Sequence, residues 1–353
     1  AAMRAGTDPG THAIKRMQFL NREVSVCMQN ENGPCPLLAL VNVLLLRGTL
    51  KFHPNRSEIT SDQLVELLAH HILEKNPVEG DDSTQATIIK TIDDIVQILP
   101  SLKQGLDVNV HFSGISDFEF DARISVFDML DVRLYHGWVV GRDDEDVYKA
   151  VHSLSYNQLV DKVIMADESS GGDSDGKRTS ASLAATLHES ELLRKFLDET
   201  ASQFTYAGLL QLHEQINDRQ LCAFFRNNHF STLYKMDGKL FLLATDVGYR
   251  TNRAIGWELL NDIDGNTELV SPAFGVPNDY VSPNDIGQKL IDARSNDMDA
   301  DEMLALQLQR AEDDYVRRQP EYVARKAKKK KDKEKRAAAA EGNNEGGKDC
   351  VVM

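Results

Sequence analysis

The chain has 353 residues, of which 41% are hydrophobic, and a formal net charge of −15. This size suffices for one large hydrophobic core or two modest ones, and no apolar run is long enough to span a bilayer. The negative charge argues against nucleic acid as the main ligand. The cysteines at positions 27, 35, 222 and 350 form neither a zinc pattern nor a disulfide framework, which predicts a reducing compartment such as the cytoplasm, and no metal or other cofactor.

The N-terminal part contains a candidate nucleophile. Residues 1–11 are polar, which predicts a flexible start, and a short strand is expected at 24–28. A helix is expected from about Cys35 to Arg47, because Pro36 has no N–H to lose and its fixed φ suits a first helical turn. Unpaired N–H groups and the helix dipole there favour a thiolate and predict a lowered pKa for Cys35. The alternative is a buried structural cysteine.

The middle of the chain is predicted to form a helical lobe. Residues 61–74 and 86–99 repeat apolar side chains at helical spacing, which indicates core-facing helices. Residues 165–182 are rich in Ser, Gly and Asp without an apolar period, so a mobile insertion is expected there. The other expected elements are a strand at 108–112, a helical turn at 125–130, and helices at 189–196 and 206–216.

A candidate base lies in the region from 221 to 244, which predicts antiparallel sheet. Asn227 and Asn228 separate two apolar strands, and His229 stands at the start of the second. An imidazole on a sheet facing a thiol at a helix terminus is the arrangement of a thiol protease, in which the imidazole acts first as base and then as acid. Nine other histidines compete for this role.

Gln29 and Asp246 are candidates to complete the site. Gln29 lies six residues before Cys35, a spacing that papain-like proteases share, and its amide together with the Cys35 N–H can stabilise an oxyanion. Alternatively, Gln29 braces the loop. Asp246 follows His229 by seventeen residues and either orients the imidazole or forms a turn. Together these features predict an α+β fold, a papain-like cysteine protease variant with a helical lobe, an antiparallel sheet and a cleft between them.

Two segments carry a resemblance to a known family. QNENGPCPLLALVNVLLLRG at 29–48 and FFRNNHFST at 224–232 resemble the MINDY family of cysteine deubiquitinases, and the likeness runs over most of 12–280. It implies a catalytic domain at 12–282 that hydrolyses isopeptide bonds in polyubiquitin, preferably in chains linked through ubiquitin's lysine forty-eight and trimmed from the distal end. The resemblance makes Cys35 the nucleophile, His229 the general base and Gln29 the oxyanion donor, and it places Ser231 along the active site.

The region 283–324 is expected to be a linker followed by a ubiquitin-interacting helix. Within 301–318, apolar residues form a partial face that includes Leu304 and Leu308, with Ala305 as the small residue between them and acidic residues on both sides. This pattern resembles ubiquitin-interacting helices, in forward or inverted direction. The alternative is an ordinary amphipathic helix docked on the catalytic domain. Tethering of a weak ubiquitin-binding helix would favour long chains as partners.

The last segment, 325–353, predicts a flexible polybasic tail with a lipidation signal. Residues 325–336 contain nine basic and two acidic side chains, and the chain ends in Cys350, two valines and a methionine. This ending is a prenylation signal, and basic residues beside it add attraction to an anionic membrane. Taken separately, the lysine run is equally typical of a nuclear localisation patch.

Three functions remain open at this point. The first is a deubiquitinase that acts through Cys35. The second is a catalytically silent polyubiquitin-binding scaffold tethered to membranes. The third is a cysteine peptidase that acts on peptides or ubiquitin-like proteins.

Overall fold

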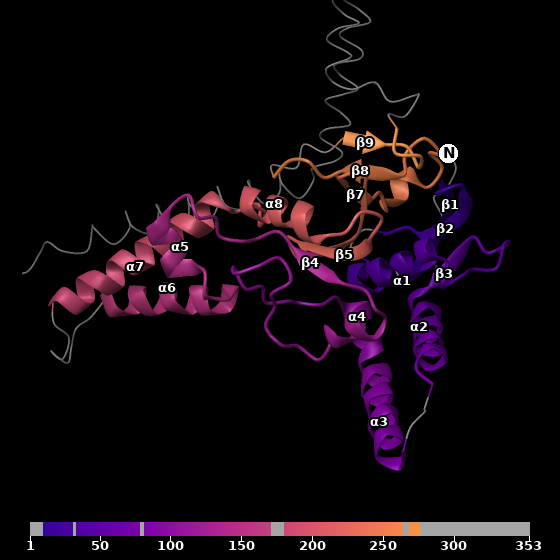
Figure 1. The fold of residues 1–353 in the computed structure, drawn as a ribbon, viewed down its shortest axis with the longest axis horizontal. Helices are drawn as coiled ribbons and strands as arrows, with labels where there is room; N and C mark the ends of the chain where they lie inside the picture. The colour runs from indigo at the N-terminus through magenta and orange to yellow at the C-terminus, as the bar shows by residue number, and fades with distance from the viewer. Residues whose placement is uncertain (1–9, 31–32, 78–80, 171–179, 264–267, 276–353) are drawn as a thin grey trace, which may run out of the picture. The chain divides into compact units, whose positions relative to one another are not determined.

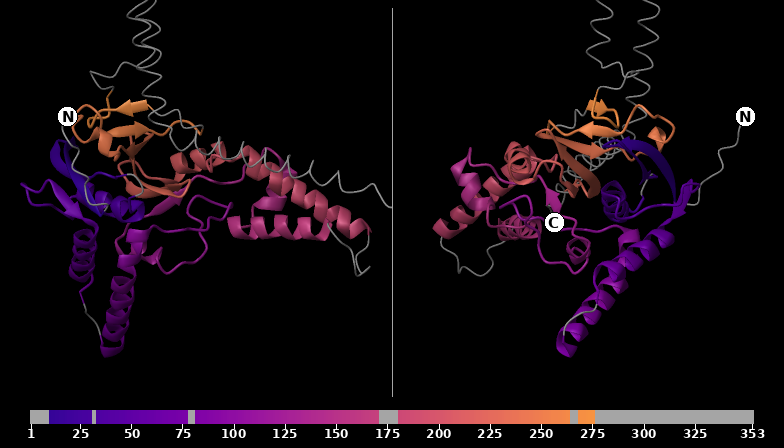
Figure 2. Two further views of the ribbon diagram at one scale, coloured as in Figure 1. Left: turned by 180° about the vertical axis from the view of Figure 1, so that it is seen from behind. Right: turned by 45° about the vertical axis from the view of Figure 1, so that its right-hand side comes forward.

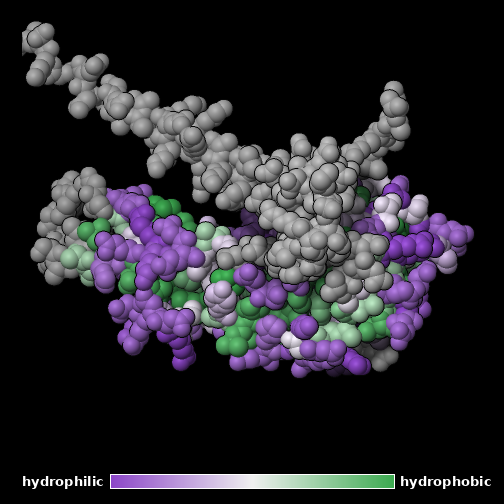
Figure 3. All heavy atoms as spheres, turned by 90° about the horizontal axis from the view of Figure 1, so that it is seen from above, coloured by the Kyte–Doolittle hydropathy of each residue, from purple (hydrophilic) through white to green (hydrophobic). Residues whose placement is uncertain are grey.

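A computed structural model describes residues 10–30, 33–77, 81–170, 180–263 and 268–275. All of them belong to one compact unit, 1–280, and the second unit, 281–353, lies outside the described residues. None of the helices in the described ranges combines the length and the apolar character that crossing a bilayer requires. Hydrophobic side chains appear in patches among hydrophilic ones on the face drawn in Figure 3, as on most folded proteins.

The chain enters the fold through a small antiparallel sheet of order β2-β1-β3. Its strands are β1 (Thr11–Phe19), β2 (Arg22–Cys27) and β3 (Glu58–Thr60). Thr11 was expected to end the flexible N-terminus, but it is already part of β1 because it pairs with Thr60. The strand expected at 24–28 corresponds to β2, and it leads directly towards Gln29.

Helix α1 (Cys35–Arg47) has the predicted bounds and is buried from Cys35 to Leu46. Pro36 occupies its first turn, and Gly48 ends it with the left-handed φ of 80° that glycine tolerates. Asn42, the polar interruption of the apolar run, is fully buried and bonds the backbone of Cys27 through both amide atoms. The helix therefore packs against β2 on one side and against β5 and β6 on another (Figure 1).

A six-stranded sheet of order β4-β5-β6-β7-β8-β9 forms the second layer. Its antiparallel part was predicted, but β4 pairs with β5 in parallel, so the sheet is mixed. A parallel neighbour requires a long crossover connection, and a crossover between distant segments leaves no local sequence signal. The strands are β4 (Leu134–His136), β5 (Leu221–Arg226), β6 (His229–Met236), β7 (Lys239–Leu243), β8 (Trp257–Leu259) and β9 (Glu268–Val270).

The helices form two groups, which the views of Figure 2 separate. The first contains α2 (Ser61–Lys75), α3 (Asp82–Ile98), η1 (Leu99–Gln104) and α4 (Ser125–Met129). The second contains α5 (Glu145–Val151), α6 (Tyr156–Ser170), α7 (Ser180–Glu199) and α8 (Tyr206–Gln215). The mixed helix and sheet content confirms an α+β fold, while the papain-like relationship stays a prediction.

Two local expectations are wrong. Residues 108–112 form only isolated bridges, Val110 with Phe118 and His111 with Ser155, because none of the described segments pairs with them as a continuous strand. The mobile insertion expected at 165–182 is helical at both ends, since α6 reaches Ser170 and α7 begins at Ser180. These two helices pack against each other, and this packing stabilises helical structure that the polar composition did not indicate. Residues 171–179 lie outside the described residues.

Candidate active site

Cys35 begins α1 and is only 9% exposed. Its backbone N–H donates to the carbonyl of Gly33 at 2.8 Å. Burial raises the pKa of the Cys35 thiol, and the backbone N–H groups of Phe230 and of Cys35 itself offset this only in part. The lowered pKa expected from the helix N-terminus is therefore wrong for this structure, because loss of water outweighs the two N–H groups.

His229 is the first residue of β6, opposite Arg226 at the end of β5. The turn between them uses Asn227 and Asn228, both left-handed with φ of 51° and 57°, as a two-residue hairpin requires. His229 is exposed at one side, and partial desolvation by the surrounding protein lowers its pKa, so the neutral form is favoured. This form is the one that accepts a proton.

Cys35 and His229, the predicted nucleophile and base, are connected through Phe230. Phe230 directly follows His229, and its backbone N–H interacts with the sulfur of Cys35. The two predicted residues, far apart in sequence, thus come from elements that pack together, α1 and β6. Within the described part of the chain, no hydrogen bond joins the ring of His229 to Sγ. The fold therefore brings together the elements that carry Cys35 and His229, without a hydrogen bond between the two side chains.

Gln29 is held between β2 and the segment after β7. Its N–H donates to Thr245 at 2.6 Å, and its carbonyl accepts from Val247 at 3.2 Å. It lines a cavity of about 560 Å³ together with His229 and Ser231. Cys35 does not line this cavity. The other lining residues are Asn30, Phe224, Arg226, Asn227, Leu242, Leu243, Thr245, Asp246, Val247 and Glu258.

Asp246 lines the same cavity but is engaged elsewhere. Its Oδ1 accepts the N–H of Gly248 at 2.6 Å and caps the short helix η2 (Val247–Tyr249). Among the described residues, no hydrogen bond or ion pair links Asp246 to His229. Asp246 therefore forms a turn, which was one of the two interpretations of this residue. The geometry does not support the other, in which Asp246 orients the imidazole of His229.

Sequence reasoning missed two groups that position the site. The backbone N–H of Phe230 carries no side-chain signal, so only the fold reveals it. Arg226 braces the turn before His229, since its guanidinium donates to the carbonyls of Ser202 at 3.0 Å and Ile263 at 2.6 Å. The signal in the sequence that could have identified Arg226 is its position as the last residue of an otherwise apolar strand.

The structure describes three of the four cysteines but not the predicted C-terminal site residues. Cys27, Cys35 and Cys222 are free, and the described residues contain no group of three or more His, Cys, Asp or Glu side chains arranged to hold a metal ion. Leu304, Ala305 and Leu308 of the predicted ubiquitin-interacting helix, and Cys350 of the prenylation signal, lie outside the described residues.

Comparison with known proteins identifies the family of the chain. The family model for MINDY deubiquitinase matches residues 10–274. A mouse (Mus musculus) protein named ubiquitin carboxyl-terminal hydrolase MINDY-2 is 38% identical over 296 residues, which is 84% of this chain and 46% of the relative. The human protein ubiquitin carboxyl-terminal hydrolase MINDY-1 is 38% identical over 260 residues, 74% of this chain and 53% of the relative.

These figures mean that the chain spans about half the length of the curated relatives it matches. The matched region contains every described element of the fold, from β1 to β9, and with them Gln29, Cys35 and His229. On the strength of this match, the chain belongs to the MINDY deubiquitinase family.

Proposed function

We propose that the protein is a cysteine-type deubiquitinase that hydrolyses isopeptide bonds in polyubiquitin. Cys35 is the nucleophile, His229 the general base and acid, and Gln29 the oxyanion donor. The observation that carries the proposal is the contact of the Phe230 N–H with the Cys35 sulfur, directly beside His229. Gln29 and His229 also line one cavity.

The reaction begins when His229 takes the proton of the Cys35 thiol, and the thiolate attacks the carbonyl of the last ubiquitin glycine. The negative oxygen is stabilised by the Gln29 amide and the Cys35 N–H. The lysine amine leaves with the proton from His229, and water then hydrolyses the thioester. Because the Cys35 N–H donates to Gly33 at 2.8 Å, this bond must break before the N–H serves the oxyanion.

The substrate we propose is polyubiquitin linked through lysine forty-eight and trimmed from the distal end, with resemblance to the family as its basis. The test is a panel of defined ubiquitin chains with all linkages, digested by the full chain and by Cys35→Ala. We expect cleavage of one linkage above the others by the wild type only. Equal cleavage by Cys35→Ala would remove the nucleophile assignment.

Gln29→Ala separates the oxyanion role from a bracing role. Loss of one oxyanion donor lowers turnover about 10²- to 10³-fold, whereas chain binding should hold. Undiminished turnover would leave Gln29 only its backbone bonds to Thr245 and Val247. Capture of Cys35 by a ubiquitin carrying a C-terminal electrophile distinguishes an enzyme from a silent scaffold.

For the C-terminal region we propose ubiquitin binding through Leu304, Ala305 and Leu308 and membrane association through a prenyl group on Cys350. Both rest on sequence patterns. Cys350→Ser should move the protein from membranes to the soluble fraction of lysed cells. An unchanged distribution would contradict the lipid anchor without touching the catalytic proposal.

A further inference from the structure

Thr232 is the last residue of the segment 224–232, and the proposed mechanism gives it no role. Its hydroxyl donates a hydrogen bond to the carbonyl oxygen of Ala39 at 3.2 Å. Thr232 lies on β6, which begins with His229, and Ala39 lies on α1, which begins with Cys35. The bond therefore joins the two elements that carry the proposed base and nucleophile.

Two contacts at matching steps connect α1 to β6. The first joins the Phe230 N–H to the Cys35 sulfur, and the second joins Thr232 to Ala39. From Phe230 to Thr232 the strand advances by about 6.6 Å. From Cys35 to Ala39 the helix advances by about 6 Å. Because the two steps are nearly equal, both contacts form at once when the helix runs along the strand. One contact alone leaves the helix free to pivot, whereas two fix its position along β6.

The Phe230 N–H is available to the sulfur because of the hairpin that precedes it. Arg226 and His229 flank the two-residue turn, so they form a hydrogen-bonded pair. The next pair, Phe225 with Phe230, is then of the non-hydrogen-bonded kind, and its N–H groups point away from the partner strand. The Phe230 amide thus reports its contact with Cys35 and not the pairing of β5 with β6.

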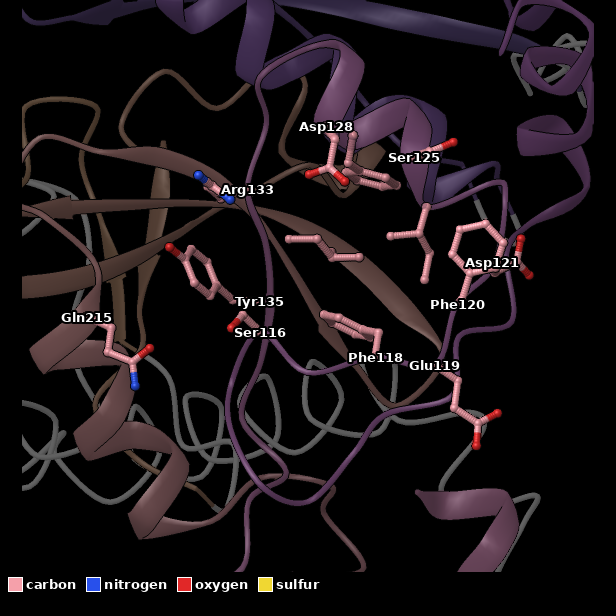
Figure 4. A pocket seen from close by; sticks show the side chains of 13 residues that line it. Ser116, Phe118, Glu119, Phe120, Asp121, Ser125, Asp128, Arg133, Tyr135 and Gln215 are labelled. Atoms are coloured by element: carbon pink, nitrogen blue, oxygen red, sulfur yellow. The ribbon is translucent and has the colours of Figure 1, made fainter. Parts of the chain in front are cut away.

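The ring of Phe230 is anchored independently of Thr232. It stacks on Phe127 of α4, with ring centroids 5.8 Å apart and an interplanar angle of 24°. Phe127 also lines the cavity of about 410 Å³ that is drawn in Figure 4. The two rings are only 1% and 2% exposed, so the stack is a packing contact that holds Phe230 in place. The bond of Thr232 then sets the position of α1 against this anchored part of β6.

The hydroxyl of Thr232 can be removed without disturbing the helix. Thr232 is 1% exposed and Ala39 is 3% exposed, so the bond is shielded from water. A carbonyl oxygen has two lone pairs, and that of Ala39 keeps its bond within the helix when the hydroxyl is lost. Valine has the shape of threonine with a methyl group in place of the hydroxyl. Thr232→Val therefore breaks the connection between α1 and β6 and preserves the packing.

We propose that Thr232 is a positioning residue for isopeptide hydrolysis, because its bond to Ala39 holds the Cys35 sulfur at the Phe230 N–H, beside His229. Thr232 acts through α1 and not on the substrate. A misplacement of reacting atoms by about 1 Å costs about 10²-fold in rate, so a small shift of the helix is sufficient to impair turnover. The assignment rests on the proposed deubiquitinase function and adds the residue that aligns its nucleophile.

The kinetic test compares Thr232→Val with Thr232→Ser in the full chain, with defined ubiquitin chains as substrate and circular dichroism to show that each variant is folded. Thr232→Val should lower kcat about 10- to 100-fold and leave KM unchanged, whereas Thr232→Ser keeps the hydroxyl and should keep kcat within about threefold of wild type. The matched control is Thr60→Val, which removes a hydroxyl that caps α2 and should leave kcat unchanged. An equal loss of kcat in Thr232→Ser would assign the effect to packing and overturn the proposal.

Hydrogen exchange of the Phe230 amide tests the same contact without turnover, by NMR of protein with nitrogen-labelled phenylalanine. In Thr232→Val this amide should exchange about tenfold faster than in wild type, and in Thr60→Val at the wild-type rate. Either a wild-type kcat or a wild-type exchange rate in Thr232→Val would overturn the positioning role. Failure of the wild-type protein to cleave any ubiquitin chain would instead overturn the proposed function, and the exchange rate would still decide whether Thr232 maintains the contact of Phe230 with Cys35.

Discussion

Asn42 offers a direct test of how helix α1 is fixed to β2, the strand that leads to Gln29. Its Oδ1 accepts the N–H of Cys27 at 2.7 Å, and its Nδ2 donates to the carbonyl of Cys27 at 3.0 Å. Both residues are fully buried. Solvent water therefore cannot replace either hydrogen bond when the amide is removed.

The magnitude follows from the two orphaned backbone groups. Each buried polar group left without a partner costs about 1–3 kcal/mol, so Asn42→Leu should lower the free energy of unfolding by about 2–6 kcal/mol. Leucine keeps the branching at Cγ and leaves no cavity, which separates the polar cost from the cavity cost of Asn42→Ala. Asn42→Ala should be destabilised at least as much, because it leaves a cavity as well.

The assay is urea unfolding of each variant, followed by circular dichroism, with turnover of ubiquitin chains measured under native conditions. Val43→Ala is the control, since Val43 is a buried neighbour on α1 that carries no polar side-chain bond. It should lose stability by packing alone and keep Gln29 in place. Equal free energies of unfolding for Asn42→Leu and wild type would refute the claim that the two buried hydrogen bonds of Asn42 stabilise the fold.

Three further predictions follow from other positions. Burial lowers the pKa of His136 to about 4, so the folded protein favours its neutral form. The contribution of His136 to the free energy of unfolding is complete above about pH 6.5 and falls as the pH drops towards 4. The difference in free energy of unfolding between wild type and His136→Gln should therefore narrow by up to about 1.4 kcal/mol per pH unit in this window, and a constant difference would contradict this. Gly208→Ala places a Cβ 2.0 Å from the Gly137 carbonyl oxygen and should cost about 1–3 kcal/mol or more in thermal unfolding, whereas Gly10→Ala, with nothing within 4 Å, should be silent. Because burial raises the pKa of Cys35, alkylation of Cys35 by iodoacetamide at pH 7, read by mass spectrometry, should be slower than that of a free peptide thiol, and faster modification would count against the buried thiol.

Much of the local structure was predictable because it is encoded in short segments. Pro36 marks the start of α1, and Gly48 its end. Asn227 and Asn228 mark the turn that delivers His229 to the start of β6. These signals depend on the backbone preferences of single residues, and such preferences act within a few positions along the chain. The family and its candidate catalytic residues followed from the same short segments.

The errors share another cause. The parallel pairing of β4 with β5 joins strands more than eighty residues apart. The order of the ends of 165–182 comes from the packing of α6 against α7. The raised pKa of Cys35 reflects the atoms that surround its sulfur, which the helix-start signal does not describe. Each of these properties depends on contacts between distant segments.

The sequence by itself thus determined where helices, turns and candidate catalytic side chains stand along the chain, because backbone preference and side-chain chemistry are local. Tertiary structure alone decided that Phe230 links His229 to Cys35, that Asp246 caps η2, and that Phe127 stacks on Phe230. Burial, desolvation and stacking are sums over neighbours in space, and those neighbours are chosen only when the whole core packs.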